Sequence, residues 1–196
     1  MRGLRSGLAA GLALAPAAAS AHTGTGLAGG FVSGVEHPLS GSDHLLAMVA
    51  VGLWGAFLGR PLIYLLPIVF PMMMVVGAAA GMYDMPVPPP EIGIALSVLV
   101  LGACIAFAYR APVPLAVPIV AGFALFHGYA HGRELPSAAD PVGYSMGFVL
   151  ATGLLHVAGI LIGSLTCHKK GATAVRLGGG AIAAAGVSFL IQAAAR

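Results

Sequence analysis

Long apolar blocks, separated by short charged or proline-rich breaks, follow one another from residue 42 to the end of the 196-residue sequence. Each block has about 20 residues, the length that a helix needs to cross a hydrocarbon layer about 30 Å thick. Helices are the expected elements because a backbone that faces lipid must satisfy its own hydrogen bonds. The pattern predicts about six transmembrane helices. They cover residues 42–59, 61–82, 91–109, 114–132, 142–165 and 175–195.

Residues 1–21 have the organisation of a secretory signal peptide. Two arginines precede an apolar run, and the segment ends in Ala19-Ser20-Ala21, an A-x-A cleavage pattern. Cleavage leaves His22 at the mature N-terminus, with residues 22–196 as one polytopic helical membrane domain. An uncleaved signal anchor is the alternative, although the apolar run is short for a span.

The composition agrees with a membrane protein. Hydrophobic residues make up 59% of the chain and charged residues 8%, and the mean hydropathy is +0.97. A soluble domain has about 25% charged residues. The nine lysines and arginines are scattered singly, so no nucleic-acid partner is expected. The sequence therefore predicts an all-α integral membrane protein whose surroundings are the lipid bilayer, and it leaves the oligomeric state open.

The charges between the spans predict an orientation. A cleaved signal peptide places the mature N-terminus outside the cell, and the spans then alternate. The connections expected inside carry most of the basic residues, as membrane insertion favours: Arg60, Arg110, Lys169, Lys170 and Arg176. The segments expected outside carry acidic residues: Glu36, Asp84, Glu91, Glu134 and Asp140. We expect a multi-pass protein of the cytoplasmic membrane.

Histidines and acids gather at the expected outer end of the first span. His37, Asp43 and His44 belong to the stretch Glu36-His37-Pro38-Leu39-Ser40-Gly41-Ser42-Asp43-His44. Pro38 and Gly41 are expected to interrupt a helix there, so a shared helical face for the two histidines is not assured. Asp43 offers a carboxylate, either as a metal ligand or as the group that orients an imidazole.

A second group of histidines lies at the expected outer end of the fourth span. His127 and His131 are four residues apart, so one helical face can present both imidazoles to one ion. Glu134 follows them directly. His22, with its free amine after cleavage, is another candidate ligand on the outer side. Glu36 and Glu134 are either ligands or solvated acids, and His156 in the fifth span is either a packed residue or a group on a metal path.

Imidazole and carboxylate together suit Zn, Cu, Fe or Ni. The two cysteines, Cys104 and Cys167, do not form the paired motif of a structural zinc site. Polar groups are costly inside a membrane, so the gathering of these histidines and Asp43 at one depth indicates a functional site. The residues predict a permease for a divalent metal and leave Ni²⁺, Co²⁺ and Zn²⁺ as candidate substrates.

At these residues the chain resembles the HupE/UreJ family of nickel permeases. His37, Asp43 and His44 meet the family's His-x5-Asp-His element. Residues 126–134 (Phe-His-Gly-Tyr-Ala-His-Gly-Arg-Glu) resemble its second element, Phe-His-Gly-x-Ala-x-His-Gly-x-Glu, with one residue fewer between the histidines. The resemblance implies a secondary permease that moves Ni²⁺ inward for metalloenzymes such as hydrogenase or urease. It implies that the first element is essential and that His127, His131 and Glu134 assist. Ni²⁺ is then a transported ligand, and no permanently bound cofactor is expected.

Two other classes of function stay open. A metal-dependent intramembrane enzyme would use Glu134 as general base and a metal-bound water as nucleophile. The sequence has no His-Glu-x-x-His motif, so we expect no enzymatic activity. A structural subunit that anchors a maturation complex would keep its function after its histidines are replaced.

Overall fold

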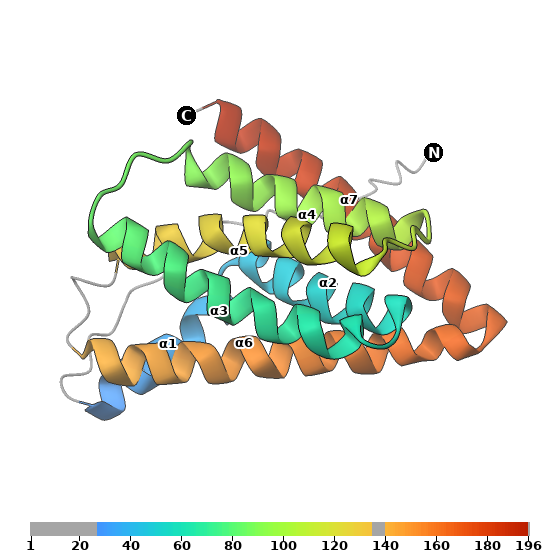
Figure 1. Cartoon of the computed structure of the whole chain (residues 1–196), viewed down its shortest axis with the longest axis horizontal. Coiled ribbons are helices and arrows are strands. Elements are labelled where there is room, and N and C mark those ends of the chain that lie inside the picture. Colours follow the sequence, from blue (N-terminus) through green and yellow to red (C-terminus); the bar gives the residue numbers. More distant parts are fainter. Residues whose placement is uncertain (1–26, 135–139, 196) are drawn as a thin grey trace, which may run out of the picture.

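The computed structural model describes residues 27–134 and 140–195, and this part of the chain is built from helices (Figure 1). The predicted signal peptide and His22 lie outside the described residues. The helices are α1 (Leu27–Ser40), α2 (Ser42–Leu58), α3 (Leu62–Met82), α4 (Pro90–Ala106), α5 (Val113–Glu134), α6 (Pro141–Ser164) and α7 (Lys169–Ala194). A short 3-10 helix, η2 (Leu165–Cys167), joins α6 to α7.

The six predicted spans correspond to α2 to α7. Four of these helices, α3, α5, α6 and α7, are long and apolar enough to cross a membrane. A fifth span exists if α1 and α2, which are bent by 81° at their junction, act as one broken span. Helix α4 is apolar but has 17 residues. Over residues 27–134 and 140–195 the protein is therefore all-helical, with four to five helices able to span a membrane, and the count of six remains a prediction.

Helix α1 was missed by the sequence pattern. It contains three glycines and Pro38, residues that disfavour helix in isolation. The expected interruption falls only at Gly41, because α1 continues through Pro38 to Ser40. Packing on α6 compensates for the poor local propensity. A Cβ at Gly34 would overlap the backbone carbonyl of Tyr144, so glycine permits this close approach.

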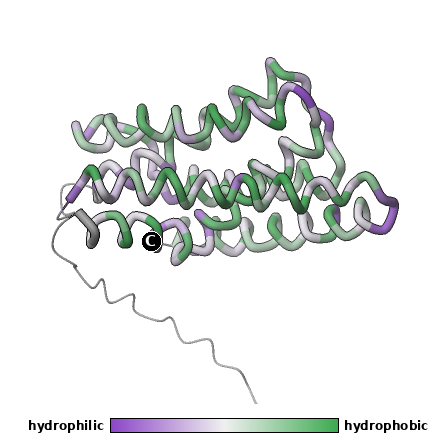
Figure 2. Tube along the Cα trace, turned by 90° about the horizontal axis from the view of Figure 1, so that it is seen from below, coloured by the Kyte–Doolittle hydropathy of each residue, from purple (hydrophilic) through white to green (hydrophobic). Residues whose placement is uncertain are grey.

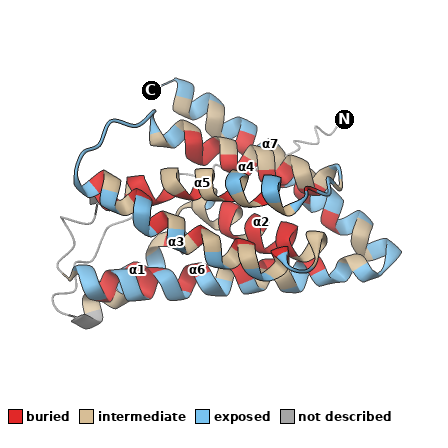
Figure 3. Cartoon of the chain, in the orientation of Figure 1, coloured by how far each residue is buried: buried red, intermediate tan, exposed pale blue. Residues whose placement is uncertain are grey.

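Large apolar side chains cover the outside of the bundle. Met72 and Val75 of α3 are 64% exposed, and Leu161 of α6 is 63% exposed. Hydrophobic residues dominate the helices, while several hydrophilic residues lie at the turns (Figure 2). The buried positions face the interior (Figure 3), where Trp54 and Phe70 are fully buried. A soluble monomer rarely exposes so much apolar surface, whereas a lipid-facing surface is expected to be apolar.

Candidate metal site

Four histidines from three helices meet at one end of the bundle. Ring centroids are 4.7 Å apart for His37 and His131, for His131 and His44, and for His44 and His127. The bend at Gly41 brings His37 of α1 within 6.2 Å of His44 of α2. The two histidine groups of the sequence thus form one cluster, which we call the histidine cluster: His37, His44, His127 and His131.

The glycine after each histidine of α5 fixes how that helix lies beside α3. A Cβ at Gly128 would overlap the backbone carbonyl of Met74, and one at Gly132 would overlap that of Ala78. The two helix backbones therefore touch at these positions, in the manner of small-residue contacts between membrane helices. His127 and His131, one turn apart, share the α5 face that points into the bundle, and both are buried.

Asp43 orients the His44 ring. Its Oδ1 lies 3.1 Å from Nδ1 of His44 and also accepts the backbone N–H of His44 at 2.9 Å. A carboxylate can only accept, so Nδ1 of His44 carries the proton in this contact. Within the described residues, Nε2 of His44 is buried and has no hydrogen-bond partner. Of the two roles considered for Asp43, this geometry is that of an orienting group.

His127 forms a hydrogen bond with a residue that the sequence pattern did not single out, Ser97 of α4. Its Nε2 lies 2.9 Å from Oγ of Ser97 on α4, and the Ser97 hydroxyl donates to the carbonyl of Ile94 at 2.6 Å. Both His127 and Ser97 are fully buried. The available signal was a single hydroxyl in α4, whose charged residue, Glu91, lies in the first turn. Buried polar groups in a membrane helix are costly and usually have a partner.

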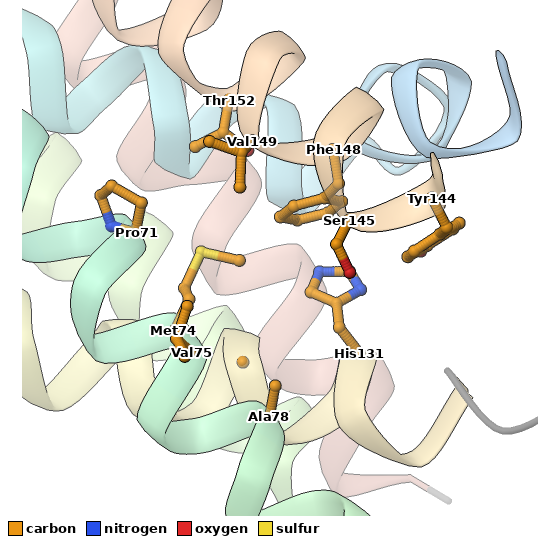
Figure 4. A pocket seen from close by; sticks show the side chains of 11 residues that line it. Pro71, Met74, Val75, Ala78, His131, Tyr144, Ser145, Phe148, Val149 and Thr152 are labelled. Carbon is orange, nitrogen blue, oxygen red and sulfur yellow. The ribbon is translucent and has the colours of Figure 1, made fainter. Parts of the chain in front are cut away.

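A cavity of about 90 Å³ lies beside the cluster, between α3, α5 and α6 (Figure 4). His131, Met74 and Thr152 are among the side chains that line it. Thr152 is 1% exposed, and its Oγ1 has no hydrogen-bond partner among the described residues. His156 lies one turn further along α6 and is 2% exposed. The cavity thus extends along α6 as far as Thr152, one turn short of His156.

The remaining predicted residues lie away from the cluster or outside the described part. The Phe70 ring contacts both His127 and His156, with centroid distances of 5.4 Å and 5.6 Å, and so links His156 to the cluster. Glu36 is exposed on α1. Glu134 ends α5, and its side chain, like all of His22, is outside the described part.

The cluster is not a preassembled metal cage. In the described ranges, 27–134 and 140–195, no three His, Cys, Asp or Glu side chains are already arranged to hold one ion. The imidazoles meet edge to face, and the rings of His44 and His127 each turn one nitrogen toward Asp43 or Ser97. Three-fold ligation would therefore require some ring rotation.

The fold and the cluster together define a class: a multi-pass helical membrane protein with a histidine-rich site at one end of the bundle. A family model described as HupE / UreJ protein matches residues 10–189. The chain is also 44% identical to Protein HupE of Rhizobium leguminosarum bv. viciae over 182 residues. This alignment covers 93% of this chain and 94% of that relative. No solved structure shows significant similarity. The chain belongs to the HupE/UreJ family.

Proposed function

We propose that this chain is a secondary permease that carries Ni²⁺ inward across the cytoplasmic membrane, where it supplies metalloenzymes such as hydrogenase or urease. The observation that carries the proposal is the meeting of four imidazoles from α1, α2 and α5 at one end of an apolar bundle. Membership in the HupE/UreJ family supports it. In this proposal the metal ion is cargo, and the protein is neither an enzyme nor the holder of a permanent cofactor.

The chemistry of the cluster suits a dehydrating divalent cation. Neutral imidazole nitrogens are good ligands for Ni²⁺ and for its neighbours in the first transition row. Nε2 of His44 and Nδ1 of His127 are buried without hydrogen-bond partners in the described part of the chain. Leaving such atoms unpaired costs free energy, and a bound cation would recover it. The cluster is therefore a capture site that replaces part of the ion's water shell.

The proposed path runs from the histidine cluster through the cavity to His156. With the mature N-terminus outside, the cluster faces the outer side of the membrane and the ion moves inward. The Met74 thioether and the Thr152 hydroxyl, which line the cavity, are weak ligands along this route, and the His156 imidazole is the next nitrogen ligand. Weak successive sites favour release, as conduction requires.

The proposal is tested by measuring ⁶³Ni²⁺ uptake in cells that express the wild type or Asp43→Ala at equal membrane levels. We expect uptake to fall to background in Asp43→Ala, because the His44 ring loses its orienting partner. His168→Ala is the matched control, since His168 lies in the exposed turn between η2 and α7, and its uptake should be normal. Normal uptake by Asp43→Ala would contradict the proposal.

The same assay separates Ni²⁺ from Co²⁺, the alternative substrate. Ligand type alone does not select between these two ions, because both accept imidazole and carboxylate. If Ni²⁺ is the substrate, excess unlabelled Ni²⁺ should abolish ⁶³Ni²⁺ uptake, whereas an equal concentration of Co²⁺ should reduce it less. Stronger competition by Co²⁺ would assign the permease to Co²⁺.

A further inference from the structure

We propose that Ser97 is a positioning residue that sets the tautomer of His127 and thereby presents the Nδ1 lone pair of that ring to the metal ion. The inference deepens the proposed function and rests on it for its biological meaning. Its structural part, the identity of the protonated nitrogen, can be measured without any metal.

The assignment follows from counting hydrogens. A serine hydroxyl carries one proton, and the Ser97 hydroxyl donates it to the Ile94 carbonyl at 2.6 Å. In the contact of 2.9 Å between Ser97 Oγ and His127 Nε2, the ring must then donate its N–H and the Ser97 oxygen must accept it. A neutral imidazole has one N–H, so a His127 protonated on Nε2 has its lone pair on Nδ1.

The opposite tautomer fits the surroundings poorly. With the proton on Nδ1, Ser97 would have to donate to Nε2 and give up the short hydrogen bond to Ile94. The Nδ1–H group would in addition be buried without an acceptor among the described residues. A buried donor without a partner costs free energy, so the surroundings favour the Nε2–H form.

Ser97 and Asp43 play equivalent parts for two neighbouring rings. Asp43 binds Nδ1 of His44 and leaves Nε2, while Ser97 binds Nε2 of His127 and leaves Nδ1. The two ring centroids are 4.7 Å apart. In metal-binding histidines the N–H of the second ring nitrogen usually donates a hydrogen bond to a fixed acceptor, which sets the tautomer and the ring orientation.

The contact depends on the close approach of α4 to α5. One turn before Ser97, a Cβ at Gly93 would overlap the ring of Phe126, the residue that precedes His127. Glycine at this position lets α4 lie against the segment that carries the histidine. Ser97 therefore brings a fourth helix, which carries none of the four histidines, into the construction of the site.

The tautomer is measured by ¹⁵N NMR of the histidine-labelled, metal-free protein in nanodiscs at pH 8, where an ordinary imidazole is neutral (pKa about 6.5). The His127 signal is assigned by its loss in His127→Gln. We expect the chemical shifts of an Nε2–H ring in the wild type and in Ser97→Thr, and a changed pattern in Ser97→Ala. An Nδ1–H ring in the wild type would overturn the inference.

Ni²⁺ binding by the same samples provides the functional readout. We expect Ser97→Ala to raise the Kd by about 10–100-fold, the usual effect of losing a group that orients a metal ligand. Ser97→Thr retains the hydroxyl and should bind nearly as well as the wild type, which separates the hydroxyl from mere packing. Unchanged affinity in Ser97→Ala would overturn the positioning role.

The two readouts also separate this inference from the proposed function. A wild type with an Nε2–H ring that binds no Ni²⁺ would support the tautomer assignment and refute the proposed permease. A wild type that binds Ni²⁺ with an Nδ1–H ring would refute the role of Ser97 alone.

Discussion

At the scale of single residues, the site consists of imidazoles whose orientation is set by neighbours. Sequence spacing singled out His37, His44, His127 and His131, and the structure brings their rings together. Which nitrogen of each ring stays free could not be read from spacing. That detail depends on contacts between distant parts of the chain, such as the Ser97 to His127 hydrogen bond between residues 30 positions apart.

Ni²⁺ binding should depend on pH, because a protonated imidazole has no lone pair for a metal. An ordinary imidazole has a pKa of about 6.5, so the neutral fraction decreases as the pH is lowered through this value. We therefore expect the Ni²⁺ affinity of the purified protein to be highest above pH 7 and to fall steeply between about pH 7 and pH 5.5. Titrations by isothermal calorimetry check this, and an affinity that stays constant down to pH 5 would argue against imidazole ligation.

At the scale of helices, the apolar blocks predicted α2 to α7 to within a few residues at most ends. Hydrophobic length is a strong signal for these elements because each must match the thickness of a bilayer. Helix α1 could not be found in this way, since its glycines and Pro38 obscure it and its stability comes from packing on α6. The consequence for the site is substantial, because α1 carries His37 into the cluster.

The contact between α3 and α5 is tested by two glycine substitutions in the same helix. In Gly128→Ala the new Cβ overlaps the Met74 carbonyl, and we expect a loss of about 1–3 kcal/mol of stability, typical of overpacking. Gly122 has open space around its Cβ position, so Gly122→Ala should be neutral or stabilising by up to about 1 kcal/mol. Thermal unfolding in detergent, followed by circular dichroism, compares them. Equal melting temperatures would show that the two backbones do not touch as described.

At the scale of the whole molecule, apolar side chains face outward and the histidine cluster lies at one end of the bundle. Composition and hydropathy were sufficient to predict the class, a multi-pass helical protein. The exposure of side chains such as Met72 and Leu161 agrees with it, because soluble monomers rarely expose so much apolar surface. The cavity beside the histidine cluster, whose lining includes His131, emerged only from the packing of α3, α5 and α6.

The central claim, that this chain by itself moves Ni²⁺ across a membrane, is tested most directly with the purified protein in liposomes that enclose a metal-quenched fluorescent dye. We expect external Ni²⁺ to quench the dye rapidly in liposomes with the wild type. Liposomes with a folded His44→Ala variant should respond as slowly as empty ones, because His44 is in contact with two other rings of the cluster, those of His127 and His131. Equal quenching by the wild type, the variant and empty liposomes would contradict the claim.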